Sequence, residues 1–106
     1  MDTLPQTTIE HLNALMQACK EVLPDCRFAI YDTEDETVRT KNPQRVIDEM
    51  QGGDEEYGLE VYDSTSQYQC TFYLLPYEED DMVFDYSSNQ IADQIFNLYL
   101  TKTERN

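Results

Sequence analysis

The sequence lacks several residue types that common active sites require. It has no tryptophan, one histidine and three glycines among 106 residues. The glycines, in Gly52-Gly53 and at Gly58, do not form the pattern of a phosphate-binding loop. The single histidine, His11, lies among polar neighbours in the first turn of a predicted helix, so a Ser-His-Asp or Cys-His arrangement has very weak support. We therefore do not expect this chain to be an enzyme.

Cysteine is scarce, and its positions do not suggest pairing. The number is odd and there is no Cys-x-x-Cys motif, which argues against a disulfide framework and against a zinc site. The pattern indicates a reducing compartment, and we expect a cytoplasmic protein. The three positions are Cys19, Cys26 and Cys70.

Long apolar runs are missing as well. No stretch approaches the roughly 20 apolar residues that a membrane-spanning helix needs. Residues 1–5 have neither the basic start nor the apolar segment of a secretory signal, so we expect no signal peptide.

One acidic segment deserves comparison with a calcium loop. Residues 32–36 carry oxygen ligands at alternate positions. An EF-hand loop that began at Asp32 would require glycine at its sixth position and glutamate at its twelfth. Thr37 and Pro43 stand there instead. We expect no metal and no cofactor.

The most informative shortage is that of positive charge. The formal net charge is −15. Residues 1–45 carry eight acids and five bases, whereas residues 46–101 carry thirteen acids and no lysine or arginine. Interspersed lysines would relieve the repulsion, so folding alone does not explain their absence. Such a charge opposes binding to nucleic acids and anionic membranes, and it favours fast encounter with basic surfaces.

The N-terminal helix has a recognisable start and end. Thr7 and Glu10 have the spacing of a capping box, with Thr7 as the N-cap. Apolar residues then recur at three- and four-residue intervals, which is typical of a helix with one buried side. Pro24 is expected to end it.

Two further helices are predicted. Asn42 as the N-cap and Pro43 at the first helical position begin a short one, which Gly52-Gly53 stops. Ser87 or Ser88 is expected to cap the last helix. The nearby bases Arg39, Lys41 and Arg45 are expected to form internal ion pairs rather than a nucleic-acid-binding patch.

Alternation of apolar and polar residues predicts strands at 26–31, 37–40, 57–62, 68–74 and 82–86. Asp63-Ser64-Thr65-Ser66 has turn composition, so the third and fourth strands should form a hairpin. In the expected register Val61 lies opposite Tyr68, Leu59 opposite Cys70 and Tyr57 opposite Phe72, with all six side chains in the core.

The predicted fold class is α+β. A single domain over residues 1–106 would hold an antiparallel β-meander of three to five strands, packed by the N- and C-terminal helices, with a short middle helix. The face of the hairpin opposite the core would be at least partly open. It would carry Glu60, Tyr62, Gln69, Thr71 and Tyr73.

Acidic residues beside tyrosines predict a protein-binding surface, because carboxylates and aromatic rings both attract lysine and arginine. The hypothesis is a small inhibitor or immunity-type protein. It would mimic phosphate charge and cover the nucleic-acid-binding surface of a basic protein, such as a nuclease, a restriction or CRISPR effector, or a DNA-binding protein. The residues expected to bind the partner are Asp54, Glu55, Glu56, Glu60, Tyr62, Tyr73, Tyr77, Glu78, Glu79, Asp80, Asp81 and Asp85.

Three alternatives stay open at this point. The acids are also consistent with a solvated face that only maintains solubility. Small size, acidity and alternating helices and strands also fit a cytoplasmic secretion-type chaperone or adaptor, which would bind a client through apolar grooves. The open sheet face would serve a homodimer equally well.

Overall fold

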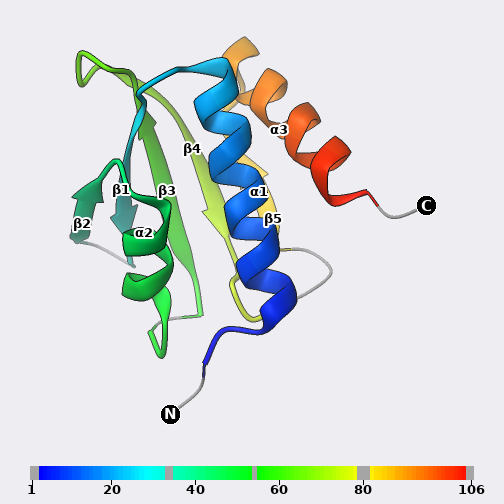
Figure 1. The fold of residues 1–106 in the computed structure, drawn as a ribbon. Helices are drawn as coiled ribbons and strands as arrows, with labels where there is room; N and C mark the ends of the chain where they lie inside the picture. Colours follow the sequence, from blue (N-terminus) through cyan, green and yellow to red (C-terminus); the bar gives the residue numbers. More distant parts are fainter. Residues whose placement is uncertain (1–2, 33–34, 54, 79–81, 105–106) are drawn as a thin grey trace.

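The predicted fold class is confirmed. The computed structural model describes residues 3–32, 35–53, 55–78 and 82–104. One five-stranded antiparallel sheet, in the order β2-β1-β3-β4-β5, is combined with three helices (Figure 1). The elements are α1 (Gln6–Val22), β1 (Arg27–Tyr31), β2 (Glu36–Thr40), α2 (Pro43–Met50), β3 (Tyr57–Tyr62), β4 (Tyr68–Leu74), β5 (Val83–Tyr86) and α3 (Gln90–Thr103).

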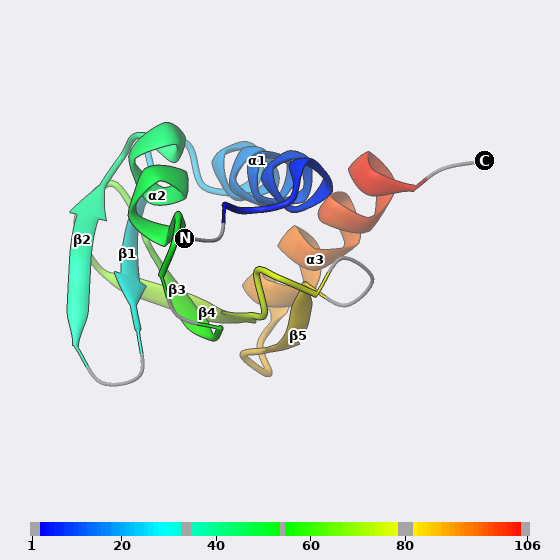
Figure 2. The ribbon, with the colours of Figure 1, turned by 90° about the horizontal axis from the view of Figure 1, so that it is seen from below.

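The helices lie on one side of the sheet, with α1 packed between α2 and α3 (Figure 2). The core is formed where their apolar sides meet the inner face of the central strands. Alternate residues of β3 and β4 point into it, as their alternating sequence requires. Its largest fully buried side chains are Phe28, Phe72, Leu12, Leu15, Met16, Ile30, Ile47, Met50, Leu59, Leu74, Met82 and Ile95. Within the described ranges, no helix is long and apolar enough to cross a membrane.

The start of α2 is as predicted. Asn42 is the N-cap, and its side-chain oxygen accepts a hydrogen bond of 3.0 Å from the backbone N–H of Gln44. Pro43 takes the first helical position, where a missing N–H costs nothing. After Met50 the chain turns at Gly52, whose φ of 66° lies in the left-handed region that glycine tolerates.

The predicted caps of the other two helices are wrong. α1 begins at Gln6, two residues before the start expected from a cap at Thr7, and the Thr7 side chain forms no capping hydrogen bond. The cause is a tertiary anchor, because buried Leu4 donates its N–H to the side-chain oxygen of Gln51 and so fixes where the chain enters the helix. α3 is capped by Asn89 instead of Ser87 or Ser88, and its side chain accepts a hydrogen bond from the N–H of Ala92.

The register of the β3–β4 hairpin differs from the prediction by two residues. Tyr57 lies opposite Leu74, Leu59 opposite Phe72 and Val61 opposite Cys70. The turn explains the difference, because one side-chain oxygen of Asp63 accepts hydrogen bonds from the N–H groups of Thr65 and Gln67 and closes a wider loop. Since side chains alternate with a period of two, the shift leaves the core residues of the hairpin on their predicted face.

Tyr68 is the exception, because it was expected in the core and is 51% exposed. The pairing is irregular between Val61 and Tyr62, so that Tyr68 comes opposite Tyr62. The two rings meet edge to face at 5.8 Å, and the Tyr68 hydroxyl shares a hydrogen bond of 2.6 Å with that of Thr71. The bulge thus moves one aromatic ring from the core to the open face of the sheet.

Replacing Asn42 with alanine should lower the free energy of unfolding by about 1 kcal/mol, because the first turn of α2 loses its cap. Urea denaturation followed by circular dichroism would measure the change. Asn42→Asp keeps a side-chain oxygen at the same position and should retain most of the stability. Equal stability of Asn42→Ala and the unmodified chain would contradict the capping role.

Candidate binding surface

The strand order brings separate acidic segments to one end of the sheet. β1 runs antiparallel to β2 and β3, and β4 runs antiparallel to β3 and β5. The residues that follow β1, those that precede β3 and those that follow β4 therefore lie at the same end (Figure 1). We call the described acids of these segments the acidic end: Asp32, Asp35, Glu55, Glu56 and Glu78.

A hollow of about 360 Å³ opens beside the acidic end, between the ends of β1, β3 and β4. Three carboxylates line it, from Asp32, Glu56 and Glu60. Aromatic rings and carboxylates together favour a guanidinium or ammonium group, through charge-assisted hydrogen bonds and cation–π contact. We call it the acidic hollow, and its remaining lining residues are Tyr31, Tyr57, Gly58, Thr71 and Tyr73.

A second hollow, of about 400 Å³, brings Glu55 and Glu78 together from segments on either side of the β3–β4 hairpin. Tyr77 also lines it, and among the described residues its buried hydroxyl finds no hydrogen-bond partner. A buried hydroxyl without a hydrogen-bond partner is energetically costly. The predicted residues Glu55, Tyr77 and Glu78 are thus close together.

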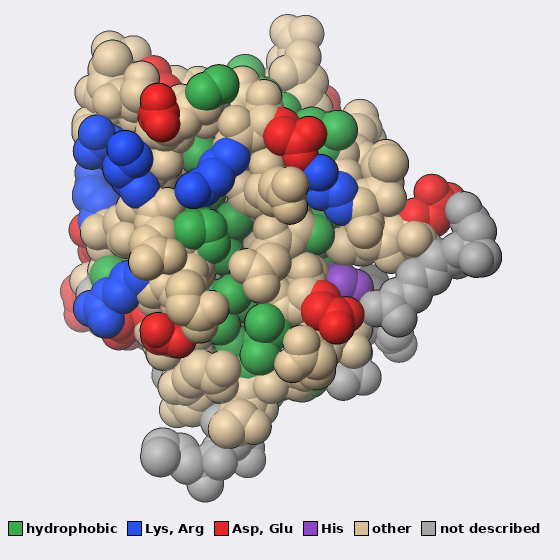
Figure 3. Space-filling view, viewed as in Figure 1, with side chains coloured by type: hydrophobic (Ala, Val, Ile, Leu, Met, Phe, Trp, Pro, Cys, Tyr) green, Lys and Arg blue, Asp and Glu red, His purple; other side chains and the backbone are tan. Residues whose placement is uncertain are grey.

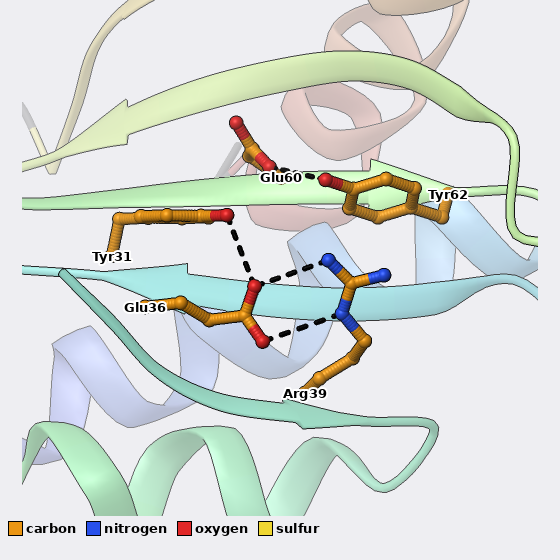
Figure 4. Close-up of polar contacts among 5 residues, drawn as sticks. All are labelled: Tyr31, Glu36, Arg39, Glu60 and Tyr62. Atoms are coloured by element: carbon orange, nitrogen blue, oxygen red, sulfur yellow. Dashed lines mark hydrogen bonds and ion pairs between the residues drawn. The ribbon is translucent and has the colours of Figure 1, made fainter.

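A polar network orders the open face of the sheet next to the acidic hollow (Figure 4). The Arg39 guanidinium donates to both carboxylate oxygens of Glu36, at 3.1 and 3.3 Å, and lies 4.4 Å from the centre of the Tyr62 ring. The Tyr31 hydroxyl donates to Glu36 at 3.0 Å, and the Tyr62 hydroxyl donates to Glu60 at 2.6 Å. These groups hold one another in place more than they stabilise the fold, because exposed ion pairs contribute little.

The network shifts the titration of its members. Hydrogen bonding from Arg39 lowers the pKa of the Glu36 carboxyl, so this group stays ionised. The hydrogen bond to Glu60, together with burial, raises the pKa of Tyr62 from 10 to about 12. Tyr62 therefore stays neutral and keeps donating to Glu60, which leaves the other oxygen of that carboxylate for a ligand.

Aromatic side chains extend this surface along the outer strands. Tyr73 is 41% exposed and Phe84 is 46% exposed, and their rings lie 6.3 Å apart. Asp85 is paired with Tyr73 across β4 and β5 and is also exposed. Large rings with few rotatable bonds are typical of protein interfaces.

The predicted site residues thus fall into three groups. Glu55, Glu56, Tyr77 and Glu78 gather at the end of the sheet, and the open face carries Glu60, Tyr62, Tyr73 and Asp85. Asp54, Glu79, Asp80 and Asp81 lie outside the described residues.

Five residues that line the acidic hollow were not among the predicted site residues: Tyr31, Asp32, Tyr57, Gly58 and Thr71. Tyr31 and Asp32 end β1 and become its neighbours only because β1 pairs with β3, a pairing between distant segments. Tyr57 was assigned to the core and is buried there, yet it also lines the hollow. The acidic run after Tyr31 could have indicated this convergence. In an antiparallel sheet, alternate loops along the chain lie at the same end of the sheet, so the loop after β1 could lie beside other acidic loops.

Comparison of the chain with models of protein families, with curated proteins and with solved structures gave no match. The described ranges contain no group of three or more His, Cys, Asp or Glu side chains arranged to hold a metal ion. All three cysteines are buried and free, and burial raises the pKa of the Cys70 thiol to about 12. A thiol of this kind is a poor nucleophile.

Tyr62 should titrate near pH 12, and Glu60→Gln should return its pKa toward 10, because the neighbouring negative charge is removed. The ring-carbon NMR signal of Tyr62 would follow the titration. Since the folded pKa is the higher one, the contribution of Tyr62 to stability is complete below pH 10 and is lost as the pH rises through about 12. Glu104→Gln, a charge removed elsewhere, should not move this pKa; an unchanged value in Glu60→Gln would contradict the role of Glu60.

Proposed function

We propose that this chain is a protein inhibitor of the immunity or DNA-mimic type, which binds the basic nucleic-acid-binding surface of a partner protein. The partner class comprises nucleases, restriction and CRISPR effectors, and other DNA-binding proteins. The carboxylates of the acidic end would take the positions that phosphate groups occupy on the partner. The chain itself would contact no nucleic acid and no membrane.

The observation that carries the proposal is the acidic hollow. Asp32 is distant in the sequence from Glu56 and Glu60, and the three carboxylates meet beside tyrosine rings. A face kept only for solubility needs dispersed acids, not acids that converge on a recess. A recess lined by carboxylates and rings is suited to receive a lysine or arginine side chain from another protein.

Electrostatics also supports rapid and competitive binding. A surface of one sign raises the local concentration of oppositely charged partners and speeds their association. The same phosphate-binding lysines and arginines cannot contact nucleic acid while carboxylates occupy them. Competition between this chain and nucleic acid for one partner surface follows directly.

A second candidate function is a chaperone or adaptor that binds an apolar client segment. It is favoured by a hollow of about 560 Å³ between α3 and the start of β5, beside exposed Leu100. Its apolar lining residues are Met82, Val83, Phe96, Tyr99 and Leu100. Binding of a client there would survive high salt, whereas binding through the acidic end would weaken steeply as salt screens the charges.

The proposal is tested by capture of partner proteins on the immobilised chain from nuclease-treated extracts of its own host, followed by competition with duplex DNA or RNA. We expect a basic partner that nucleic acid displaces and that salt elutes. The triple variant Glu55→Gln, Glu56→Gln, Glu78→Gln should weaken binding by about tenfold or more, because three charges of the acidic end are lost.

A matched control keeps the same net charge change. Asp25→Asn, Asp93→Asn and Glu104→Gln neutralise three exposed acids outside the acidic end. This control should bind the partner nearly as well as the unmodified chain. If both triple variants lost affinity equally, net charge rather than the acidic end would explain the effect. A partner that nucleic acid does not displace would contradict phosphate mimicry.

A further inference from the structure

Positive charge gathers at the end of the sheet opposite the acidic end. Arg27 begins β1, Arg39 and Thr40 end β2, and Lys41 follows. Ser66, in the β3–β4 turn, reaches the same place because Arg27 pairs with Tyr62 at the end of β3. Together these five residues line a hollow of about 240 Å³, and no carboxylate is among the described residues that line it. We call it the basic hollow.

The basic hollow is unexpected in a chain of net charge −15, since it holds three of the seven lysine and arginine residues. Arg39 is paired with Glu36. Arg27 and Lys41 form no ion pair with any described residue, although the sequence led us to expect one for Lys41. Bases in such an acidic chain are more stable beside acids than beside one another, so structural pairing does not account for this cluster.

A second, independent observation points to a missing acceptor. The Nε atom of Arg27 is buried and has no hydrogen-bond partner among the described residues. Arginine donors are rarely buried without an acceptor, because desolvation without a replacement bond is costly. Arg27 lines the hollow, so an oxyanion bound there would provide the acceptor after a small rotation of the side chain that opens Nε to the hollow.

The surrounding geometry is already fixed before any ligand arrives. Glu36 and the Tyr62 ring hold the Arg39 guanidinium in one orientation. Asp63 closes the turn that carries Ser66, which has a φ of 67° in the left-handed region. Fixed donors bind an oxyanion more tightly than mobile ones, because less side-chain entropy is lost.

We infer that the basic hollow is a binding site for a phosphate group, with Arg27 and Lys41 as its charged donors and Ser66 as a hydroxyl donor. A tetrahedral dianion matches several converging N–H and O–H donors, and arginine binds it in a fixed geometry. The shared chemistry is that of free phosphate and of a phosphate monoester. None of the three proposed donors is among the residues predicted to bind the partner protein, and the assignment does not depend on that proposal.

The test is an NMR titration of the Arg27 Nε–H signal with inorganic phosphate, at constant ionic strength and neutral pH. We expect a saturable shift with a dissociation constant on the order of millimolar, because the net negative charge of the chain opposes anions. Lys41→Gln should weaken binding by about tenfold, through loss of one charge-assisted contact. Lys41 is exposed, so this variant should fold, and it keeps the test valid even if Arg27→Gln does not fold.

Arg45→Gln is the matched control, because Arg45 lies on α2 outside the hollow, and it should bind phosphate as the unmodified chain does. A parallel titration with glycerol phosphate separates the two sources of the ligand. Binding of both compounds indicates a site for phosphate monoesters, and binding of inorganic phosphate alone indicates a site for the free ion. A shift that does not saturate, an equal response to acetate, or equal weakening by Arg45→Gln would overturn the assignment.

Discussion

All three helices of this protein pack on the same side of the sheet, and the distribution of charge depends on that constraint. Apart from Tyr68, the apolar residues of β3 and β4 follow an alternating pattern, so one face of each strand packs in the core under the helices. The acids of the same segment then have to emerge from the opposite face and from the strand ends. Because the strands are antiparallel, the acids that precede β3 and those that follow β4 fall at the same end of the sheet. The excess of acidic residues in the sequence is thereby concentrated on one part of the protein surface.

This arrangement makes the protein less uniformly acidic than its net charge suggests. The helical face carries both acids and bases, as Figure 3 shows. Near the open face, Glu36 and Arg39 compensate each other, and the hydrogen bond from Tyr62 orients Glu60. Several carboxylates lie close together at the acidic end, where solvent screens their repulsion. The repulsion that remains disfavours the free protein and would be relieved by a cationic partner.

The sequence predicted which segments form helices and strands, but it did not predict where α1 begins or how β3 and β4 pair. Asn42-Pro43 predicted the start of α2 correctly because both signals are local. Thr7 failed as a cap because Leu4 is anchored by Gln51, a residue from a distant segment. The hairpin register failed because the Asp63 side chain sets the loop length through hydrogen bonds that composition does not specify.

The residues of the candidate binding surface also divide into those that local sequence patterns predict and those that depend on pairing between distant segments. The acids and tyrosines of the hairpin face were predicted from alternation alone. The convergence of Asp32 with Glu56 requires the pairing of β1 with β3, and no local pattern contains that information. Tyr68 was assigned to the wrong face because a single irregular pairing reverses the alternation at the end of β3. Long-range pairing and bulges therefore limit what the sequence reveals here, whereas periodicity and turn chemistry do not.

Negative charge is concentrated at the acidic end, whereas at the opposite end Arg27 and Lys41 are accompanied by Asp25 and Asp63, and this asymmetry gives the molecule an electric dipole moment along its strands. In the field of a positively charged body, such a molecule experiences a torque as well as an attraction. It would turn its acidic end forward during the approach, before any side chains touch. The fraction of encounters that begin in a productive orientation would rise accordingly, and this gain comes from where the strands end rather than from how many charges the chain carries.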